Sequence, residues 1–427
     1  MLSAPVDAVL SALESARAGR FAEICELFAP PLRPLITAEA LEAGWNAALA
    51  QQGPITSVGA PLTEPTGTGA VVVKVAVSCE HGGFALIAPV TEQGQLAGLQ
   101  LAPPGAAEPL APWEPPAYAD PQSFDEHEVR LGADKLAVDG TLSVPHRPGP
   151  LPAVVLLAGS GSLDRDETIG RNKPFKDIAW GLTTHGVAVL RFDKVTYAHA
   201  SDLQHADRFT LSDEYLPHAL AAIECLRTHP AIDDRRIFVL GHSLGGTVAP
   251  RIAAAEPSIA GLILLAGGAQ PLHWVLVRQF SYLASLRPEN EAASRPVIEK
   301  LTEQAQRIDA GVSLSTPASE LPLGAPASYW MDLRDYDPAG VAATLGKPML
   351  ILQGGRDYQV TVADDLALWQ AALSGHPEVT IRVYPELNHL FSPGSGPSSP
   401  AEYEPAQHVD ATVITDLASW LASQRRA

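Results

Sequence analysis

From residue 122 onward, short apolar runs alternate with segments in which apolar residues recur every three or four positions. Six of the runs are rich in β-branched residues and almost free of polar ones, which is typical of parallel strands covered on both faces. Two less apolar runs, Phe124–Leu131 and Lys135–Val144, precede them and favour an opening hairpin. The pattern therefore predicts a doubly wound α/β domain with an eight-stranded, mostly parallel sheet. The six apolar runs are Pro152–Ala158, Val187–Phe192, Arg236–Leu240, Gly261–Ala266, Pro348–Gln353 and Val379–Tyr384, and helical periodicity lies near 174–185, 211–228, 244–256, 362–374 and 406–424.

One interval between the predicted strands is far longer than a simple crossover. About eighty residues separate the fourth apolar run from the fifth, whereas a parallel crossover needs about a dozen or more. The segment 270–335 within this interval has helical periodicity and many large apolar side chains. We expect it to form a helical cap over the carboxyl edge of the sheet. Trp274, Tyr329 and Trp330 are the cap side chains that we predict to bind the substrate.

The first 101 residues follow a different pattern. Two helical stretches come first and strand-like runs follow, which predicts a separate α+β domain. The closing stretch, GQLAGLQL, resembles the last strand of small cone-shaped domains of the NTF2-like type. The helical stretches are 3–28 and 38–52, and the clearest strand-like runs are Ala70–Ser78, Gly83–Val90 and Gln95–Leu101.

Residues 102–121 read APPGAAEPLAPWEPPAYADP. Proline at this density disrupts helices and sheet ladders and favours extended structure. We interpret the stretch as a linker in which Trp113 and Tyr118 anchor the chain to a surface. The predicted organisation is therefore an N-terminal domain at 1–101, the linker at 102–121, and an α/β domain at 122–427.

The balance of charges argues against several classes of function. The 427 residues carry a formal net charge of −19, whereas binding to nucleic acid or to an anionic membrane needs a basic face. No apolar run approaches the roughly 20 residues of a membrane span. The start of the chain lacks the basic region of a signal peptide, which favours a cytoplasmic location. Cys25, Cys79 and Cys225 are far apart in the sequence and form no C-x-x-C motif, so we expect free thiols.

The stretch VLGHSLGG, from Val239 to Gly246, joins a predicted strand to a predicted helix. It contains the G-x-S-x-G pattern, in which a serine is held at a sharp turn with its hydroxyl exposed at the edge of the sheet. Small residues are required two positions before and after the serine because the strand and helix backbones come close there. Gly241 and Gly245 meet this requirement, which predicts that Ser243 is a nucleophile.

A serine nucleophile needs a base, and the base needs an acid that orients it. Asp357 follows the seventh predicted strand and His389 follows the eighth, so both lie at carboxyl strand ends, where sites in open α/β sheets gather. The chain order Ser243, Asp357, His389 is that of the α/β hydrolases. We therefore predict that these residues form a catalytic triad, which needs no metal and no cofactor.

Acyl transfer also needs N–H donors that stabilise the developing oxyanion. The helix that begins at Leu244 offers its first backbone N–H and the positive end of its dipole. The loop after the third predicted strand, LLAGSGSLDRDE, supplies a second donor. We assign the donors to Leu244 and Ser160, with Gly161 as the alternative to Ser160. Gly159 and Gly161 are expected to border the substrate.

The stretch AGSGSLDRDETIGRNKPFKDIAWGLTTHGVAVLRFDKVTYAH and the later LNHLF resemble a group of bacterial α/β-hydrolase esterases that carry an extra N-terminal domain. The resemblance covers residues 122–427 and implies hydrolysis of carboxylic esters, with the predicted triad matching that of the group. The family usually carries His-Gly at the oxyanion loop, where this chain has Ala158-Gly159. This departure excludes a role for a histidine side chain there, whereas the backbone donor is retained.

The same triad also serves thioesterases, amidases, peptidases and acyltransferases, and the sequence leaves these alternatives open. A peptidase with a propeller is disfavoured because the N-terminal block is too short to form one. A non-catalytic binding module on a hydrolase fold is the alternative from a different class, although such modules usually lack a member of the triad. The expected partner is a small-molecule ester, and a homo-oligomer such as a dimer is compatible with the sequence.

Overall fold

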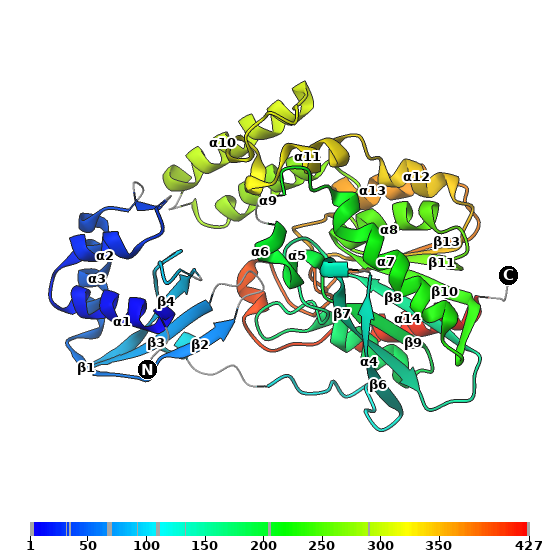
Figure 1. Cartoon of the computed structure of the whole chain (residues 1–427), viewed down its shortest axis with the longest axis horizontal. Helices are drawn as coiled ribbons and strands as arrows, with labels where there is room; N and C mark the ends of the chain where they lie inside the picture. The colour runs from blue at the N-terminus through cyan, green and yellow to red at the C-terminus, as the bar shows by residue number, and fades with distance from the viewer. Residues whose placement is uncertain are drawn as a thin grey trace. The chain divides into compact units, whose positions relative to one another are not determined.

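The computed structural model describes residues 4–30, 32–33, 36–65, 71–91, 93–107, 112–132, 134–203, 206–288 and 291–424. Contacts between backbone positions divide the chain into two compact units, Met1–Ala111 and Pro112–Ala427. Each unit contains its own sheet and its own helices (Figure 1). Among the helices in these ranges, none is both long and apolar enough to cross a membrane.

The N-terminal unit combines helices with an antiparallel sheet, which confirms the predicted α+β class. Its elements are α1 (Ala4–Arg17), α2 (Phe21–Leu27), α3 (Ala38–Gln52), β1 (Ile55–Val58), β2 (Leu62–Pro65), β3 (Val71–Cys79), β4 (Gly82–Val90) and β5 (Gln100–Ala102). The strands are ordered β1-β3-β4-β5, and β2 also pairs with β3. Along β3, Val73, Val75 and Val77 are buried and alternate with less buried residues, as expected for a sheet with one face on the core.

Three features of this unit differ from the sequence-based prediction. The run Gln95–Leu101 forms a strand only from Gln100, where β5 begins. The stretch 3–28 contains two helices rather than one, because the chain turns between them and Gly19 adopts a left-handed φ of +71° there. The strands β1 and β2 were not among the clearest runs. They have only four residues each, and β1 buries none of its side chains fully, so the alternation that reveals a strand is weak.

The larger unit is built on an eight-stranded sheet, as predicted. Its strands are β6 (Phe124–Leu131), β7 (Val138–Pro145), β8 (Leu151–Leu157), β9 (Ala188–Phe192), β10 (Ile232–His242), β11 (Gly261–Leu265), β12 (Met349–Gly354) and β13 (Val379–Tyr384). They are ordered β13-β12-β11-β10-β8-β9-β7-β6. The neighbouring pairs from β13 to β9 are parallel, whereas β7 is antiparallel to both of its neighbours. This arrangement confirms the mostly parallel sheet and the opening hairpin.

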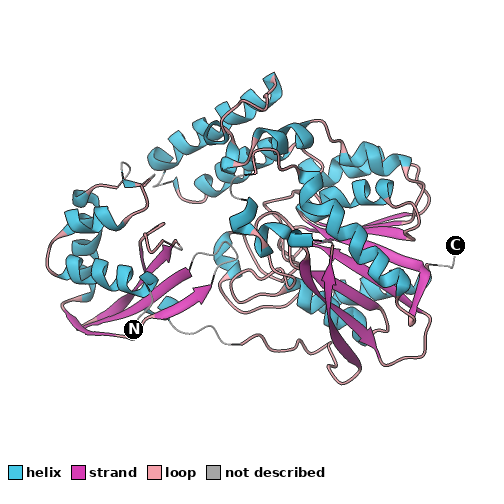
Figure 2. Ribbon diagram, viewed as in Figure 1, coloured by secondary structure: helices cyan, strands magenta, loops and turns pink. Residues whose placement is uncertain are grey.

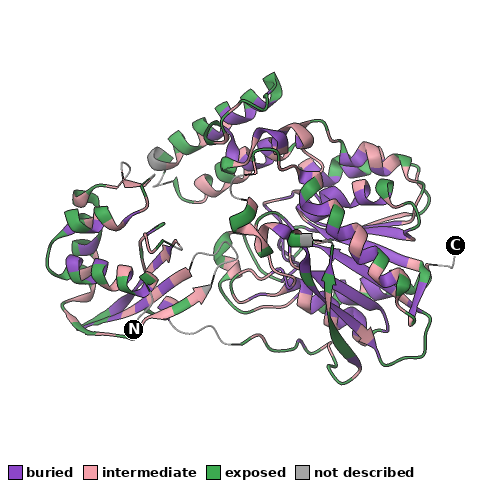
Figure 3. Cartoon of the chain, in the orientation of Figure 1, coloured by how far each residue is buried: buried purple, intermediate pink, exposed green. Residues whose placement is uncertain are grey.

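Helices cover both faces of this sheet (Figure 2). Side chains of β8 and β10 alternate between two apolar cores: Val155 and Val239 belong to the core of one face, and Leu156 and Leu240 to that of the other. The first core contains residues of α7 (Leu211–Thr228) and α8 (Leu244–Ala255), and the second contains residues of α4 (Pro174–Thr184) and α14 (Ala411–Ser423). Because every position from Ala153 to Leu157 and from Ile237 to His242 is buried, these parts of β8 and β10 are apolar runs without alternation (Figure 3).

The interval between β11 and β12 is helical, which confirms the predicted cap insertion. It contains α9 (Leu272–Ser285), α10 (Glu291–Ala310), the short 3₁₀ turns η5 (Ala318–Glu320) and η6 (Pro322–Gly324), α11 (Ala327–Arg334) and α12 (Pro338–Thr344). The insertion leaves β11 at its carboxyl end and returns to β12, so its helices begin beside the edge that carries Ser243.

The stretch predicted as a linker has structure on both sides of the boundary between the units. Its first residues extend β5 and form a 3₁₀ turn at Pro104–Ala107, and residues 108–111 lie outside the described part of the chain. Beyond them, the indole N–H of Trp113 donates to Asp177 at 2.9 Å, and the Tyr118 hydroxyl donates to the Val409 carbonyl at 2.8 Å. These two contacts hold the proline-rich chain against the larger unit.

Candidate active site

The turn at Ser243 has a backbone conformation that its flanking glycines make possible. Strand β10 ends at His242 and α8 begins at Leu244, and Ser243 between them has φ +52° and ψ −120°. Such a positive φ is strained for a residue with a side chain. A Cβ on Gly241 would overlap the carbonyl oxygen of Gly245, and a Cβ on Gly245 would overlap that of Leu157. No larger residue fits at either position without moving the strand or the helix.

Asp357 and His389 meet beside this turn. His389 Nδ1 lies 2.7 Å from Asp357 Oδ2, and both side chains are buried. The side-chain amide of Gln353 donates to the same oxygen at 3.0 Å, and the backbone N–H groups of Gln359 and Val360 donate to Oδ1 at 2.8 and 3.0 Å. The buried carboxylate thus accepts four hydrogen bonds. Because an ionised carboxylate only accepts, Nδ1 of His389 carries the hydrogen and Nε2 is left as the basic nitrogen.

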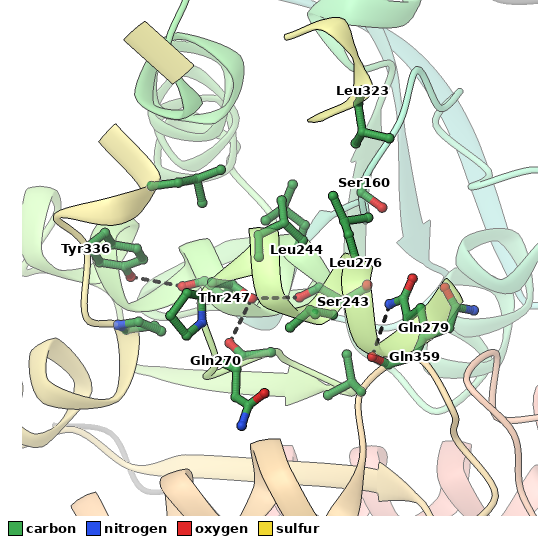
Figure 4. A pocket seen from close by; sticks show the side chains of 17 residues that line it. Ser160, Ser243, Leu244, Thr247, Gln270, Leu276, Gln279, Leu323, Tyr336 and Gln359 are labelled. Atoms are coloured by element: carbon green, nitrogen blue, oxygen red, sulfur yellow. Dashed lines mark hydrogen bonds between the residues drawn. The ribbon is translucent and has the colours of Figure 1, made fainter. Parts of the chain in front are cut away.

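Ser243, Leu244 and Ser160 line one small cavity of about 80 Å³ (Figure 4). Within the described chain, neither the Ser243 hydroxyl nor the backbone N–H of Leu244 or Ser160 donates a hydrogen bond, and Ser243 makes none to His389. Gly159 is different, because its N–H donates to Glu167 Oε1 at 2.7 Å. The three residues therefore bring to the border of this cavity a hydroxyl and two backbone N–H groups for which the described residues provide no acceptor.

The rest of this cavity is formed mainly by the cap. Leu272, Val275 and Leu276 come from one face of α9, Leu323 from η6 and Leu333 from α11. Sequence reasoning did not single out these residues, although the spacing of the three α9 residues is that of a single helix face. Leu323 lies at the mouth, with 69% of its surface exposed and a left-handed φ of +58°.

The opposite end of the cavity is more polar. Thr247, Gln270 and Tyr336 line it, and the Tyr336 hydroxyl donates to the backbone carbonyl of Thr247 at 2.9 Å (Figure 4). Gln279 of α9 and Gln359 add further polar groups, so the cavity wall combines apolar cap side chains with polar ones from several segments.

The structure places the three predicted cap rings elsewhere, which corrects their assignment to substrate binding. None of Trp274, Tyr329 and Trp330 lines the cavity beside Ser243. The Trp274 indole donates to Asp309 and the Tyr329 hydroxyl donates to Glu214, at 2.8 and 2.7 Å. Trp330 has no exposed surface and packs into the core. A large apolar ring on a cap helix can face the domain below as well as a ligand, and the sequence does not distinguish the two. Gly159 and Gly161 also lie outside the cavity lining.

A buried pair, Glu167 and His242, connects the two loops that flank Ser243. Glu167 Oε1 accepts a hydrogen bond from the Gly159 N–H. The same oxygen is hydrogen-bonded to His242 Nδ1 at 2.9 Å. His242 Nε2 lies 2.9 Å from the backbone carbonyl of His389, so that nitrogen must donate. Although burial lowers the pKa of His242, the charge of Glu167 and these hydrogen bonds outweigh it and raise the pKa above its usual value. The geometry thus fits an imidazolium that, through Glu167, ties the loop at Gly159 to the loop at His389.

This raised pKa gives a pH-dependent contribution to stability. Since folding favours protonated His242, the contribution should be complete below about pH 6.5, the ordinary histidine pKa, and should be lost as pH rises through the raised value. We expect His242→Gln to lower the free energy of unfolding by about 1–3 kcal/mol at pH 6 and by less at pH 9. Urea unfolding of the variant and the wild type across this range measures the difference. His81→Gln, at an exposed turn, is the control, and a difference that grows toward pH 9 contradicts the assignment.

Arg278 on α9 fastens the cap to the segment that follows Asp357. Its guanidinium donates to the buried carboxylate of Asp365 at 2.7 Å and to the Gln359 carbonyl at 3.0 Å. The other oxygen of Asp365 accepts the N–H groups of Ala269 and Gln270, at the start of the cap. The cap helix and the segment behind Asp357 are therefore held by one charged network.

Fold and site together define an α/β hydrolase: a serine at a strand-to-helix turn, an Asp–His pair that follows the last two strands of the sheet, and a helical cap. Sequence comparison agrees with this class. A family model described as Hydrolase_4, serine aminopeptidase S33, matches residues 167–392. Esterase EstD of Thermotoga maritima is 39% identical over 343 residues, which are 80% of this chain and 77% of that protein. Because 80% of the chain exceeds the larger unit, this match includes part of the N-terminal unit.

Two further proteins show lower similarity. The 2,6-dihydropseudooxynicotine hydrolase of Paenarthrobacter nicotinovorans is 26% identical over 208 residues, 49% of this chain and 50% of that protein. The structure of an acylaminoacyl peptidase from Pyrococcus horikoshii superposes with a TM-score of 0.50 at 13% identity, covering 88% of this chain and 57% of that one. This last similarity concerns the fold alone. The chain belongs to the α/β-hydrolase family of serine hydrolases, together with Esterase EstD.

Proposed function

We propose that this protein is a serine carboxylesterase in which Ser243, His389 and Asp357 act as nucleophile, base and orienting acid. The observation that carries the proposal is that Ser243 lines a cavity together with Leu244 and Ser160, whose N–H groups have no acceptor among the described residues, and that Nδ1 of the His389 ring is bonded to Asp357. The 39% identity to a protein named as an esterase supports an ester as the substrate.

In the first step, His389 Nε2 accepts the hydroxyl proton of Ser243 as its oxygen attacks the ester carbonyl carbon. The N–H groups of Leu244 and Ser160 donate to the resulting oxyanion, and the dipole of α8 adds to this stabilisation. When the tetrahedral intermediate collapses, the protonated His389 gives its proton to the departing alcohol and an acyl-serine remains. Asp357 keeps the ring in the required tautomer and stabilises its cation.

In the second step, water replaces the alcohol. His389 accepts a proton from the water, whose oxygen attacks the acyl carbon, and the same two N–H groups stabilise the second oxyanion. Collapse breaks the bond to Ser243, returns the proton to its oxygen and releases the carboxylic acid. The elbow thus works in both steps without a metal or a cofactor.

The size of the cavity suggests the class of acyl group. At about 80 Å³ with a wall of leucine and valine side chains, it suits a short apolar acyl chain better than a long one. We therefore expect p-nitrophenyl acetate and butyrate to be cleaved with a kcat/KM at least about tenfold above that of the palmitate ester. The long palmitoyl chain does not fit the cavity, so its carbonyl carbon cannot be positioned for attack by Ser243.

The experiment compares the three esters with a butyryl thioester and a butyryl anilide as matched substrates. A fluorophosphonate probe, followed by peptide mapping, should label Ser243. Preference for the thioester or the anilide over the ester would reassign the substrate class while leaving the serine mechanism. An unlabelled Ser243 together with no turnover of any substrate would instead favour a non-catalytic binding module.

A further inference from the structure

Lys194 lies directly behind the proposed oxyanion loop, although it has no part in the mechanism above. It follows the end of β9 and precedes the short helix α5 (Val195–Ala198), and its side chain is only 3% exposed. Its ammonium nitrogen contacts three acceptors: the Gly159 carbonyl oxygen at 2.7 Å, Glu214 Oε1 at 2.8 Å and the Tyr215 hydroxyl oxygen at 3.0 Å. All three ammonium hydrogens are therefore used, and the charge is paired inside the protein.

The Gly159 carbonyl belongs to the same peptide group as the Ser160 N–H. In a planar trans peptide the C=O and N–H bonds point in opposite directions, so holding the oxygen fixes the direction of the hydrogen. The preceding peptide group is held as well, because the Gly159 N–H donates to Glu167. A Cβ on Gly159 would lie 3.1 Å from the Cβ of Ser243, which shows how closely this backbone approaches the nucleophile.

A cation on a peptide oxygen also changes the donor at the other end of the group. It draws electrons toward the oxygen, which increases the positive charge on the N–H and strengthens the bond that this N–H donates. We propose that Lys194 is a positioning residue that orients and polarises the Gly159–Ser160 peptide so that the Ser160 N–H stabilises the oxyanion. The proposal rests on the oxyanion site described under the proposed function.

The neighbours of Lys194 favour this action through the peptide over direct attraction between the cation and the oxyanion. Glu214 balances the ammonium charge, and its second carboxylate oxygen accepts the Tyr329 hydroxyl at 2.7 Å. The Tyr215 hydroxyl lies 2.9 and 3.0 Å from the carbonyl oxygens of Ala158 and Gly159. Lys194 and Tyr215 thus both act on the backbone of the oxyanion loop, whereas Glu214 and Tyr329 hold the cation in place.

The test replaces Lys194 by methionine, which keeps the length of the side chain and removes the ammonium. Loss of a whole oxyanion donor lowers the rate by about 10²–10³-fold. Because Lys194→Met keeps the Ser160 N–H but removes its orientation and polarisation, we expect kcat to fall by about 10- to 100-fold, with KM for p-nitrophenyl acetate unchanged within about twofold. Active-site titration with the fluorophosphonate probe corrects the rates for any unfolded protein.

A second readout separates loss of oxyanion binding from general damage. The Ser243 oxygen adds to the boron atom of butylboronic acid. The tetrahedral adduct then has an oxygen at the position where the oxyanion forms. The Ki of butylboronic acid per active site should rise by about the same factor as kcat/KM falls, as expected for a transition-state analogue. A Ki equal to that of the wild type, or a loss confined to KM or to the fraction of active sites, would overturn the proposal.

Two variants complete the design. Lys173→Met is the matched control, because Lys173 also pairs with a loop carboxylate, Asp166 at 2.8 Å, but does not contact Gly159. It should keep kcat and the boronate Ki within about twofold of the wild type, since Asp166 keeps its second partner, Arg191, at 2.9 Å. If Lys194→Met does not fold, Lys194→Met combined with Glu214→Gln removes both buried charges and avoids an unpaired carboxylate. The double variant should show the same losses in kcat and boronate binding, and normal values for both would equally overturn the proposal.

These outcomes are distinct from failure of the proposed function. If the wild type cleaves no ester, or if its turnover does not depend on Ser243, the enzymatic assignment itself is wrong. If the wild type depends on Ser243 and Lys194→Met is normal in both readouts, the enzymatic assignment stands and only the role of Lys194 is wrong.

Discussion

Replacement of Ser243 by alanine should lower kcat/KM for p-nitrophenyl acetate by at least about 10⁴-fold, to the level of background hydrolysis. The physical reason is that Ser243 supplies the oxygen that forms the acyl intermediate, whereas the Thr247 and Tyr336 hydroxyls at this cavity donate to backbone carbonyls. A positive φ at residue 243 strains alanine and serine to the same degree, so the backbone turn should persist in the variant. The measurement is initial rate with purified protein, together with loss of fluorophosphonate labelling.

The control for this variant is Ser281→Ala on the exposed side of α9. The Ser281 hydroxyl donates only to the Val277 carbonyl within its own helix, so its loss should leave the rate within about twofold of the wild type. Turnover by Ser243→Ala above a tenth of the wild-type rate would mean that a different group attacks the ester.

Replacement of Asp357 by asparagine should lower kcat by about 10⁴-fold with little change in KM. An asparagine oxygen can still accept the N–H groups of Gln359 and Val360, which bond Oδ1 in the wild type. Its NH₂ group then faces both His389 Nδ1 and the amide of Gln353, two positions at which the wild-type carboxylate accepts. His389 would have to present a bare Nδ1 and carry its hydrogen on Nε2, where it can no longer accept the serine proton.

The matched control for the acid is Asp364→Asn, seven residues further along the same connection. Asp364 bonds the Thr361 hydroxyl and Arg278, and its side chain is 43% exposed, so we expect a change of less than about threefold. Equal losses in both variants would point to general disruption of this connection and would argue against a specific role of Asp357.

The parts of the fold that the sequence predicts well are those in which every residue of a segment has the same environment. Strands β8, β11 and β12 are buried on both faces, so their apolar runs mark their positions to within a residue or two. Strand β10 was predicted to begin at Arg236 but begins at Ile232, because Asp233, Asp234 and Arg235 are charged at the end of the sheet. The elbow was predictable for another reason, since only glycine satisfies the close backbone approaches around Ser243.

Other features depend on which of two surfaces a side chain meets, and the sequence does not contain that information. Trp330 and Leu333 lie on the same short helix of the cap and in the same apolar core, yet only the leucine also lines the cavity. The polar residues behind the site were equally hidden. Glu167, Lys194 and His242 come from three different elements, and each becomes informative only when the fold brings it to a backbone group of the oxyanion loop or the His389 loop.

The charged network of Arg278 includes one part of the cap and leaves out another, so the two parts should differ in the substitutions that they tolerate. A mutation that shifts α9 also strains Asp365 and the Gln359 carbonyl, and so reaches the backbone that holds Asp357. Leu323 and Leu333 approach the same cavity from segments that this network does not include. We therefore expect substitutions at Leu323 and Leu333 to change the preferred ester with a smaller loss of kcat than substitutions that shift α9, so a directed-evolution library at these two positions should retain more active variants.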